Sequence, residues 1–325
     1  MEGILVSRIV HVIFVLIIVS FGITFLMNLI PGNPAYTILG DQATQQQVVA
    51  VDKALNLNQP FFERYWHWVI ALLHGDFGVS FITHQSVIQA VGQAAPVTAE
   101  LIVVAFIMAL VVSIPAGVYC GYRPDGRFDR IWFTLTSIFI SSPVFVSALL
   151  LVFAFGVELN GFPIHFPVTG WTAITAGLGS NLWHAFLPSL TLALPLISTF
   201  SRLLRADMVA TLQEDYILAA RARGIPVRRI LVVHALRQSS LSLFTLAGIQ
   251  IGQLISGAAI AEVVFALPGL GQLFVNASST KDIPTVQGEV LFIALAYVLL
   301  NTIVDFAYSH LDPRIRSRVA GVRAR

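Results

Sequence analysis

Residues 101–122 read LIVVAFIMALVVSIPAGVYCGY and contain no Asp, Glu, Lys or Arg. A helix that crosses the roughly 30 Å hydrocarbon core of a bilayer needs about 20 such residues. Five further stretches have a similar length and apolar character, and only the last of them contains a charged residue, Asp305: 9–30, 131–157, 183–201, 241–261 and 290–311. The sequence therefore predicts an all-α polytopic membrane protein with six transmembrane helices.

The composition of the whole chain agrees with this fold class. Of the 325 residues, 56% are hydrophobic and 11% are charged, and the mean hydropathy is +0.81. A soluble domain carries about a quarter charged residues, so an ordinary soluble protein is excluded. The formal net charge of +2 gives no reason to expect a nucleic-acid partner. With Cys120 as the only cysteine, neither a disulfide framework nor a cysteine-based metal cluster is possible.

The distribution of basic residues predicts the orientation in the membrane. Sixteen of the 19 Lys and Arg residues lie before residue 9 or within 123–130, 202–237 and 314–325. Basic residues accumulate on the cytoplasmic side of membrane proteins, so we expect both termini to be cytoplasmic. The segments 31–100, 158–182 and 262–289 are then extracytoplasmic. The first apolar stretch is expected to remain as an anchor, because its apolar core is too long for a signal peptide and no cleavage site follows it.

The chain contains no internal repeat or flexible linker, which indicates one membrane domain with an inserted segment. In the insert, Thr44 is expected to cap a helix that runs to about Leu55, and Pro60 to open an aromatic-rich helix that ends before Gly75. The predicted organisation is an N-terminal tail with the first helix, an extracytoplasmic insert, a five-helix core that includes a cytoplasmic loop, and a basic cytoplasmic tail: 1–30, 31–100, 101–311 with the loop at 202–240, and 312–325.

The sequence lacks the motifs of common enzymes. It contains no HExxH, CxxC or GxSxG, and neither of its lysines, Lys53 and Lys281, follows a glycine as a Walker A lysine does. We therefore expect no catalytic residue and no metal ligand, and the chain cannot hydrolyse ATP by itself. Asp305 is the one acidic residue expected within the membrane, where pairing with a basic residue of a loop or the tail is favoured over a proton relay.

The basic loop 202–237 has helical character. Residues from Met208 to Ala222 include no Gly or Pro, which predicts a short surface helix. Gly224 can adopt the left-handed conformation that ends a helix, and Pro226 prevents the helix from continuing. The small side chains of Ala219 and Ala220 are expected to give a partner protein close access to this helix.

Residues 215–224, DYILAARARG, resemble the EAA loop of permease subunits in binding-protein-dependent ABC importers, in which EAA is followed by three residues and Gly. Ala219, Ala220 and Gly224 match this pattern, Leu218 replaces its Glu, and the ARARG run is similar to the peptide-importer branch. The resemblance implies that the short helix fits a groove on a cytoplasmic ATPase. It assigns ATPase coupling to Asp215, Tyr216, Ala219, Ala220, Arg221, Arg223 and Gly224.

A second stretch, residues 262–271 with the sequence EVVFALPGLG, is similar to the ExxFxxPGLG segment of the same permeases. Its Pro and Gly residues predict a tight, non-helical bend, which at membrane depth must be shielded by protein or line a water-filled cavity. Because the resemblance places the permeation path nearby, the candidate gate or pathway residues are Glu262, Phe265, Pro268, Gly269 and Gly271. A turn that only packs between helices is an equally open interpretation.

Four further segments resemble the first-type permease of dipeptide, oligopeptide and nickel importers, so the resemblance covers essentially the whole chain: 31–34, 55–60, 75–80 and 311–316. It implies a bacterial inner-membrane permease that forms half of a channel and imports dipeptides or short oligopeptides by alternating access. The implied partners are a second homologous permease, two ATP-binding subunits or domains, an extracytoplasmic substrate-binding protein, the peptide and membrane lipid. ATP and Mg²⁺ would bind to the partner subunits and no cofactor to this chain.

Three alternatives remain open. The same type of complex could carry nickel chelates, glutathione or haem. An ion-coupled secondary carrier that uses Asp305 and Glu289 belongs to a different class, and discontinuous helices with paired repeats would support it. An intramembrane enzyme is a third and more distant possibility.

Overall fold

The computed structural model describes residues 2–40, 43–158 and 166–311. The side chains of residues 2–9, 11 and 305–311, which include Asp305, lie outside this description. The predicted basic tail 312–325 also lies outside the described residues. The described residues are almost entirely helical and contain no strand, apart from one isolated bridge between Val79 and Ser86. This architecture confirms the all-α fold class.

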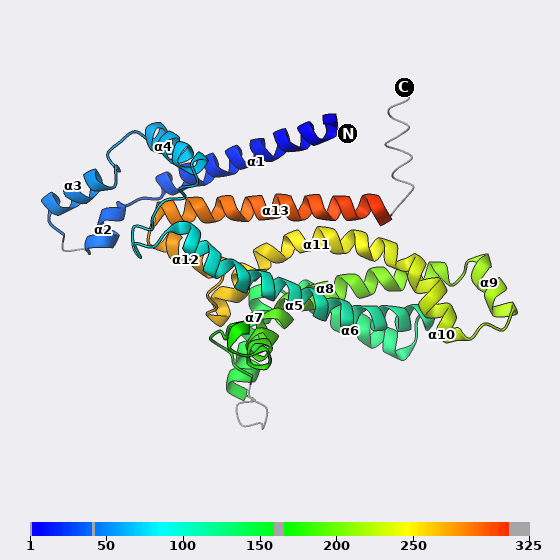
Figure 1. Ribbon diagram of the computed structural model, residues 1–325. Coiled ribbons are helices and arrows are strands. Elements are labelled where there is room, and N and C mark those ends of the chain that lie inside the picture. Colours follow the sequence, from blue (N-terminus) through cyan, green and yellow to red (C-terminus); the bar gives the residue numbers. More distant parts are fainter. Residues whose placement is uncertain (1, 41–42, 159–165, 312–325) are drawn as a thin grey trace. The chain divides into compact units, whose positions relative to one another are not determined.

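The chain forms two compact units (Figure 1). The first unit comprises residues up to Val97 and the segment Pro268–Leu300, and the second comprises Thr98–Leu267 and the residues from Asn301. The helices of the N-terminal part are α1 (Glu2–Leu29), α2 (Pro34–Leu39), α3 (Gln45–Ala54), α4 (Phe61–Leu73) and α5 (Val87–Tyr122). The central part contains α6 (Arg127–Ser141), α7 (Val144–Phe153), a π-helical turn (Ala154–Glu158), a 3-10 turn (Ile174–Ala176), α8 (Leu178–Thr211), α9 (Asp215–Ala222), α10 (Val227–Arg229), a second π-helical turn (Ile230–Ala235) and α11 (Leu236–Phe265). The chain continues through α12 (Leu270–Ser279) and α13 (Ile283–Leu311).

Five segments of the described residues are long and apolar enough to cross a membrane, and α6 with α7 adds a sixth if that bent pair counts as one span. The third predicted stretch, 131–157, is therefore not one helix, because α6 and α7 meet at an angle of 107°. Pro143 lacks an N–H group and disfavours the helical conformation of the residue before it. Ser142 accordingly has extended backbone angles (φ −85°, ψ 125°).

Several helices extend beyond the predicted apolar stretches. Helix α5 begins at Val87 rather than at residue 101, and α13 begins at Ile283 rather than at residue 290. An apolar stretch ends at a charged residue such as Glu100. A helix can continue past that residue, because its length depends on the pairing of its backbone groups. Part of the predicted insert 31–100 is thus the first part of α5.

In the first unit, helix α4 packs against α1 through aromatic side chains. The ring of Phe21 meets the rings of Phe61 and Tyr65 edge-on at 5.6 and 5.4 Å, and the hydroxyl groups of Tyr65 and Ser20 are 3.0 Å apart. The local predictions for the insert are confirmed. Thr44 caps α3 in a reciprocal capping box with Gln47, and Pro60 immediately precedes α4.

Hydrogen bonds to Asp282 join the two parts of the first unit. Asp282 lies between α12 and α13 and is 3% exposed. Its carboxylate accepts bonds from the hydroxyl groups of Ser80 (2.5 Å) and Thr285 (2.6 Å) and from the N–H of Phe81 (2.9 Å). Nearby, the side chains of Val87, Val91, Ala94 and Leu270 form a buried apolar cluster. Both sets of contacts join the N-terminal part of the unit to its C-terminal part.

In the second unit, α8 packs against α6, α7 and α11, and α11 lies alongside it in Figure 1. Helix α8 also approaches α5 closely, at two glycines of α5. A Cβ atom on Gly117 would lie 3.0 Å from the Cβ of Leu204, and one on Gly121 would lie 2.5 Å from the Cβ of Met208. Helix α8 is therefore the central element of this unit.

Candidate functional site

The predicted coupling segment forms a separate short helix, α9, after a turn at residues 212–214. The expectation of one helix from Met208 to Ala222 is wrong, because Met208 belongs to α8. Met208 and Ile217 are both fully buried, yet nine residues of continuous helix would place them about 180° apart on opposite faces. The break at 212–214 allows both side chains to be buried.

Helix α9 ends in the manner predicted for a left-handed glycine. Gly224 has φ +73°, and its N–H donates to the carbonyl of Arg221 at 2.9 Å. The N–H of Ile225 donates to the carbonyl of Ala220 at 3.2 Å, which completes a Schellman motif. Pro226 follows and precedes α10. The turn after α9 is thus defined by backbone hydrogen bonds.

The side chains of α9 divide into a buried and an exposed set. Ile217 and Ala220 face the protein interior, so the expectation that Ala219 and Ala220 are both accessible is correct only for Ala219. Tyr216 and Leu218 are 46% and 51% exposed. The other exposed residues among the predicted coupling residues are Asp215, Arg221, Arg223 and Gly224. The accessible surface therefore combines an aromatic and an aliphatic side chain with two arginines.

The charge of α9 is arranged as its helix dipole favours. Asp215 lies in the first turn and Arg221 in the last turn, where acidic and basic side chains respectively are stabilising. Partial burial, together with the negative charge of Glu214, raises the pKa of Tyr216 above its ordinary value. The Tyr216 hydroxyl is therefore neutral near pH 7 and can act as a hydrogen-bond donor on this surface.

An ion pair that the sequence did not reveal lies on α6 and α8, before the turn that leads to α9. Asp129 is 3% exposed and receives two hydrogen bonds from the guanidinium group of Arg205, at 2.7 and 2.6 Å. The N–H of Asp125 donates to the same carboxylate at 2.8 Å, and the guanidinium carbon of Arg205 lies 4.9 Å from the ring centre of Phe133. The distribution of basic residues along the sequence predicts orientation in the membrane, but it does not predict this pair.

The start and end of the coupling segment are also joined to α11 within the second unit. The hydroxyl groups of Thr211, at the end of α8, and Ser239, in α11, are 3.1 Å apart and buried. Helix α9 packs against the π-helical turn that precedes α11. Both ends of the segment that contains α9 therefore lie close to the start of α11.

The second candidate segment begins within α11. Glu262 and Phe265 are buried, at 0% and 1% exposure, and the hydroxyl of Thr98 donates to the Glu262 carboxylate at 2.6 Å. Helix α11 ends at Phe265, Ala266 has left-handed angles (φ 52°), and the N–H of Leu267 donates to the carbonyl of Glu262 at 2.9 Å. The predicted bend is therefore present after Phe265.

The glycines and the proline of this segment belong to the first unit, which the chain enters at Pro268. Pro268 is exposed and Gly269 is buried immediately before α12. Gly271 lies within α12 and not in the bend, because α12 already begins at Leu270. Gly271 is buried within this helix.

The described part of the chain was also compared with the geometry of metal sites. There, no group of three or more His, Cys, Asp or Glu side chains is placed to hold a metal ion.

Comparison with protein-family models identifies two matches that together cover most of the chain. Residues 113–317 match the model described as "Binding-protein-dependent transport system inner membrane component". Residues 1–102 match the model for the N-terminal part of the membrane component of these systems. Both candidate segments lie within the first of these matches.

Similar proteins extend over nearly the full length. A probable peptide ABC transporter permease protein of Sinorhizobium fredii is 35% identical over 96% of this chain and 98% of its own length. A putative peptide transport system permease protein of Brucella abortus is 36% identical over 97% and 99% of the two chains. The glutathione transport system permease protein GsiC of Escherichia coli is 32% identical over 96% and 98%. The chain therefore belongs to the family of inner-membrane components of binding-protein-dependent transport systems.

Proposed function

We propose that this chain is a permease subunit of an ATP-driven importer for dipeptides or short oligopeptides. The relatives from Sinorhizobium and Brucella are named for peptide transport, which favours peptides as the cargo. The relative from Escherichia coli is named for glutathione transport, which keeps glutathione as the second candidate. No observation favours nickel chelates or haem. The break between α6 and α7 would support an ion-coupled carrier only together with paired repeats, and the sequence shows none.

The observation that carries this proposal is the geometry of α9. It is a short helix with exposed Tyr216, Leu218 and Ala219, and it lies between the ends of α8 and α11. A helix of this kind suits a groove on a partner protein, because its apolar side chains are accessible while Ile217 anchors it to its own chain. We assign the contact with a cytoplasmic ATPase subunit to this surface.

The proposed complex contains a second homologous permease, two ATP-binding subunits or domains and an extracytoplasmic substrate-binding protein. ATP and Mg²⁺ bind to the ATPase subunits, since this chain has no Walker A sequence. Both termini and the loop 202–240 face the cytoplasm, in keeping with the distribution of basic residues. Closure of the ATPases moves α9, and the channel changes its access because ATP and the loaded binding protein favour different states.

The candidate pathway segment has a positional role in this mechanism. Glu262 is held by Thr98 at the end of α11, one turn before the bend at Ala266. A movement of α11 therefore reaches the bend directly. We propose that Glu262 and Phe265 help to position the gate, and that Pro268, Gly269 and Gly271 allow the chain to turn and pack there.

The test of this function replaces Gly224. A β-branched residue at φ +73° is strained by about 1–2 kcal/mol, so Gly224→Val is expected to reduce the population of correctly aimed α9, and peptide uptake, by about tenfold. Gly224→Asn should retain most activity, because Asn tolerates the left-handed region. The measurement is uptake of a labelled dipeptide by cells that contain the complete importer and no other peptide permease.

The matched control is Gly170→Val. Gly170 also has positive φ (+88°), and a Cβ at either glycine would meet no atom within 4 Å. The control should leave uptake unchanged, and the Gly224→Val complex should still assemble in the membrane. Normal uptake by Gly224→Val would remove α9 from the coupling role. Uptake of glutathione without uptake of dipeptides by the unmodified complex would replace the proposed cargo.

A further inference from the structure

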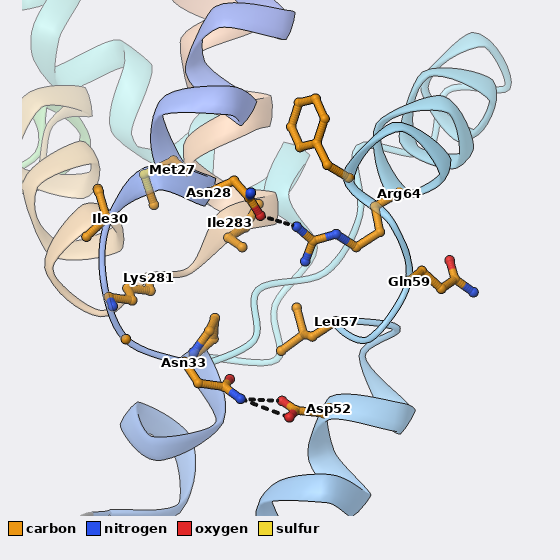
Figure 2. Close-up of a pocket in the computed structure, with 13 residues that line it drawn as sticks. Met27, Asn28, Ile30, Asn33, Asp52, Leu57, Gln59, Arg64, Lys281 and Ile283 are labelled. Atoms are coloured by element: carbon orange, nitrogen blue, oxygen red, sulfur yellow. Dashed lines mark hydrogen bonds between the residues drawn. The ribbon is translucent and has the colours of Figure 1, made fainter.

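A polar cavity lies in the first unit, at the end of α1 and the start of α13 (Figure 2). Its volume is about 360 Å³, which is in the range of small-molecule sites. Figure 2 shows Arg64, Lys281 and Asp52 lining it from α4, from the turn before α13 and from α3. The charged residues of the cavity thus come from three separate parts of the unit.

Among the described residues, no ion pair balances the positive charge of this cavity. Arg64 donates one hydrogen bond, to the side-chain oxygen of Asn28 at 2.6 Å, and its Nε atom is buried without a partner. Burial lowers the pKa of Arg64, as expected for a cation with no carboxylate beside it. Lys281 donates to the backbone carbonyl of Pro31. Both cations are therefore bound only to neutral groups of the described residues.

The single carboxylate of the cavity is already engaged. Both oxygens of Asp52 accept from the side-chain amide of Asn33, at 2.7 and 2.9 Å. The carboxylate is thus held in place without neutralising Arg64 or Lys281. A ligand with one negative group, and with a positive group for Asp52, would complement all three charges.

The surroundings of the cavity indicate a bilayer surface. Helix α1 contributes an apolar span that ends at Leu29, and the span in α13 starts at Ile283. Helix α4 carries Arg64 and exposes a stripe of large apolar side chains with spacings of four, four and three residues: Phe62 (72% exposed), Trp66 (61%), Ile70 (40%) and Leu73 (80%). An amphipathic helix with an exposed tryptophan suits the headgroup region, where spanning helices also end.

We propose that this cavity binds the phosphate of a phospholipid headgroup, with Arg64 and Lys281 as its cationic ligands. The guanidinium group offers the fork of donors that phosphate oxygens accept, including the unpaired Nε of Arg64. Asp52 accepts the ammonium group when the lipid is phosphatidylethanolamine. The bound lipid holds the start of α4 near the ends of the spans in α1 and α13, which line the same cavity.

The experiment uses the complete importer, purified in mild detergent and incubated with equal amounts of phosphatidylethanolamine, phosphatidylglycerol and phosphatidylcholine. Native mass spectrometry measures the phospholipid that remains after loosely attached lipid has been removed by activation. Loss of two charge-assisted contacts in Arg64→Gln/Lys281→Gln should weaken retention by at least about tenfold. Asp52→Asn should retain phospholipid but lose any preference for phosphatidylethanolamine.

Two variants serve as controls. Lys53→Gln removes an exposed lysine of α3 from the same insert and should retain lipid as the unmodified protein does. The single variant Arg64→Lys keeps the positive charge but loses the guanidinium fork, so it should retain part of the phospholipid. It replaces the double variant in the test if the double variant assembles poorly. Equal retention by the unmodified protein and the double variant would overturn the proposal. So would occupancy by added inorganic phosphate or peptide in place of phospholipid.

Discussion

Asp129 and Asp282 are equally buried, at 3% exposure, but they are stabilised in different ways. Asp129, in the second unit, binds the charged guanidinium group of Arg205. Asp282, in the first unit, accepts from two hydroxyl groups and one backbone N–H. The Asp129 carboxylate thus has one oppositely charged partner and one backbone donor, the N–H of Asp125, whereas the Asp282 carboxylate is stabilised by three neutral donors.

This difference predicts how each unit tolerates substitution. An ion pair fails when either partner is removed, because the remaining charge is left without compensation, but it tolerates the removal of both. When one of several neutral donors to a carboxylate is removed, the carboxylate loses only a part of its stabilisation. The second unit should therefore show strong coupling between two positions, and the first unit should show smaller, more evenly distributed effects.

The largest effect is expected when Asp129 is removed. Asp129→Ala leaves the Arg205 guanidinium without its main partner, and we expect a loss of about 3 kcal/mol of stability, measured by thermal unfolding of the purified complex. The double variant Asp129→Leu/Arg205→Met should be more stable than Asp129→Ala. If the effects of the two positions simply add, the pair is not coupled and the contrast with Asp282 disappears.

A smaller effect is expected at Asp282. Asp282→Asn keeps the size of the side chain but weakens three hydrogen bonds to a charged acceptor, for a loss of about 2 kcal/mol. Thr285→Ala removes one donor and should cost about 1 kcal/mol. Hydrogen exchange should show faster exchange at the amides of Phe81, Ile82 and Thr83, which lie at this junction. Unchanged exchange in Asp282→Asn would show that the junction does not depend on the carboxylate.

A third comparison uses two glycines of α5. A Cβ on Gly121 would lie 2.5 Å from the Cβ of Met208 and 3.2 Å from the carbonyl oxygen of Arg205, so Gly121→Ala should destabilise by about 1.5 kcal/mol. Gly92 has no atom within 4 Å of the added Cβ, and Gly92→Ala should stabilise by up to about 0.8 kcal/mol. Thermal unfolding of both variants tests the pair. A similar shift for both would mean that α5 and α8 can separate at Gly121.

Local chemistry in the sequence predicted the features that depend on neighbouring residues. The capping box of Thr44, the start of α4 after Pro60 and the left-handed Gly224 each involve residues no more than a few positions apart. The break at Pro143 had an equally local signal, but it was missed because the span was judged from its average apolarity. Proline alone does not predict such a break, however, because α8 contains Pro188 and Pro195 within one continuous helix.

Other features could not be predicted because they depend on tertiary packing. No pattern connects Asp129 with Arg205, and Ser80 binds Asp282 across 202 positions of the chain. The turn between α8 and α9 contains no Gly or Pro. It allows Met208 and Ile217 to be buried together, although a continuous helix would place them on opposite faces. The inward orientation of Ala220 follows from the same turn.

The composition of the first unit has a consequence for the order of biosynthesis. Its two parts are separated by the 170 residues from Thr98 to Leu267. At about 5–20 residues per second, a ribosome needs roughly 10–30 s to make this intervening chain. During that time Ser80 and Phe81 have no Asp282, and Val87 and Val91 have no Leu270. The N-terminal part must therefore wait in an incomplete form, so this part of the nascent chain is where an insertase or chaperone would be required.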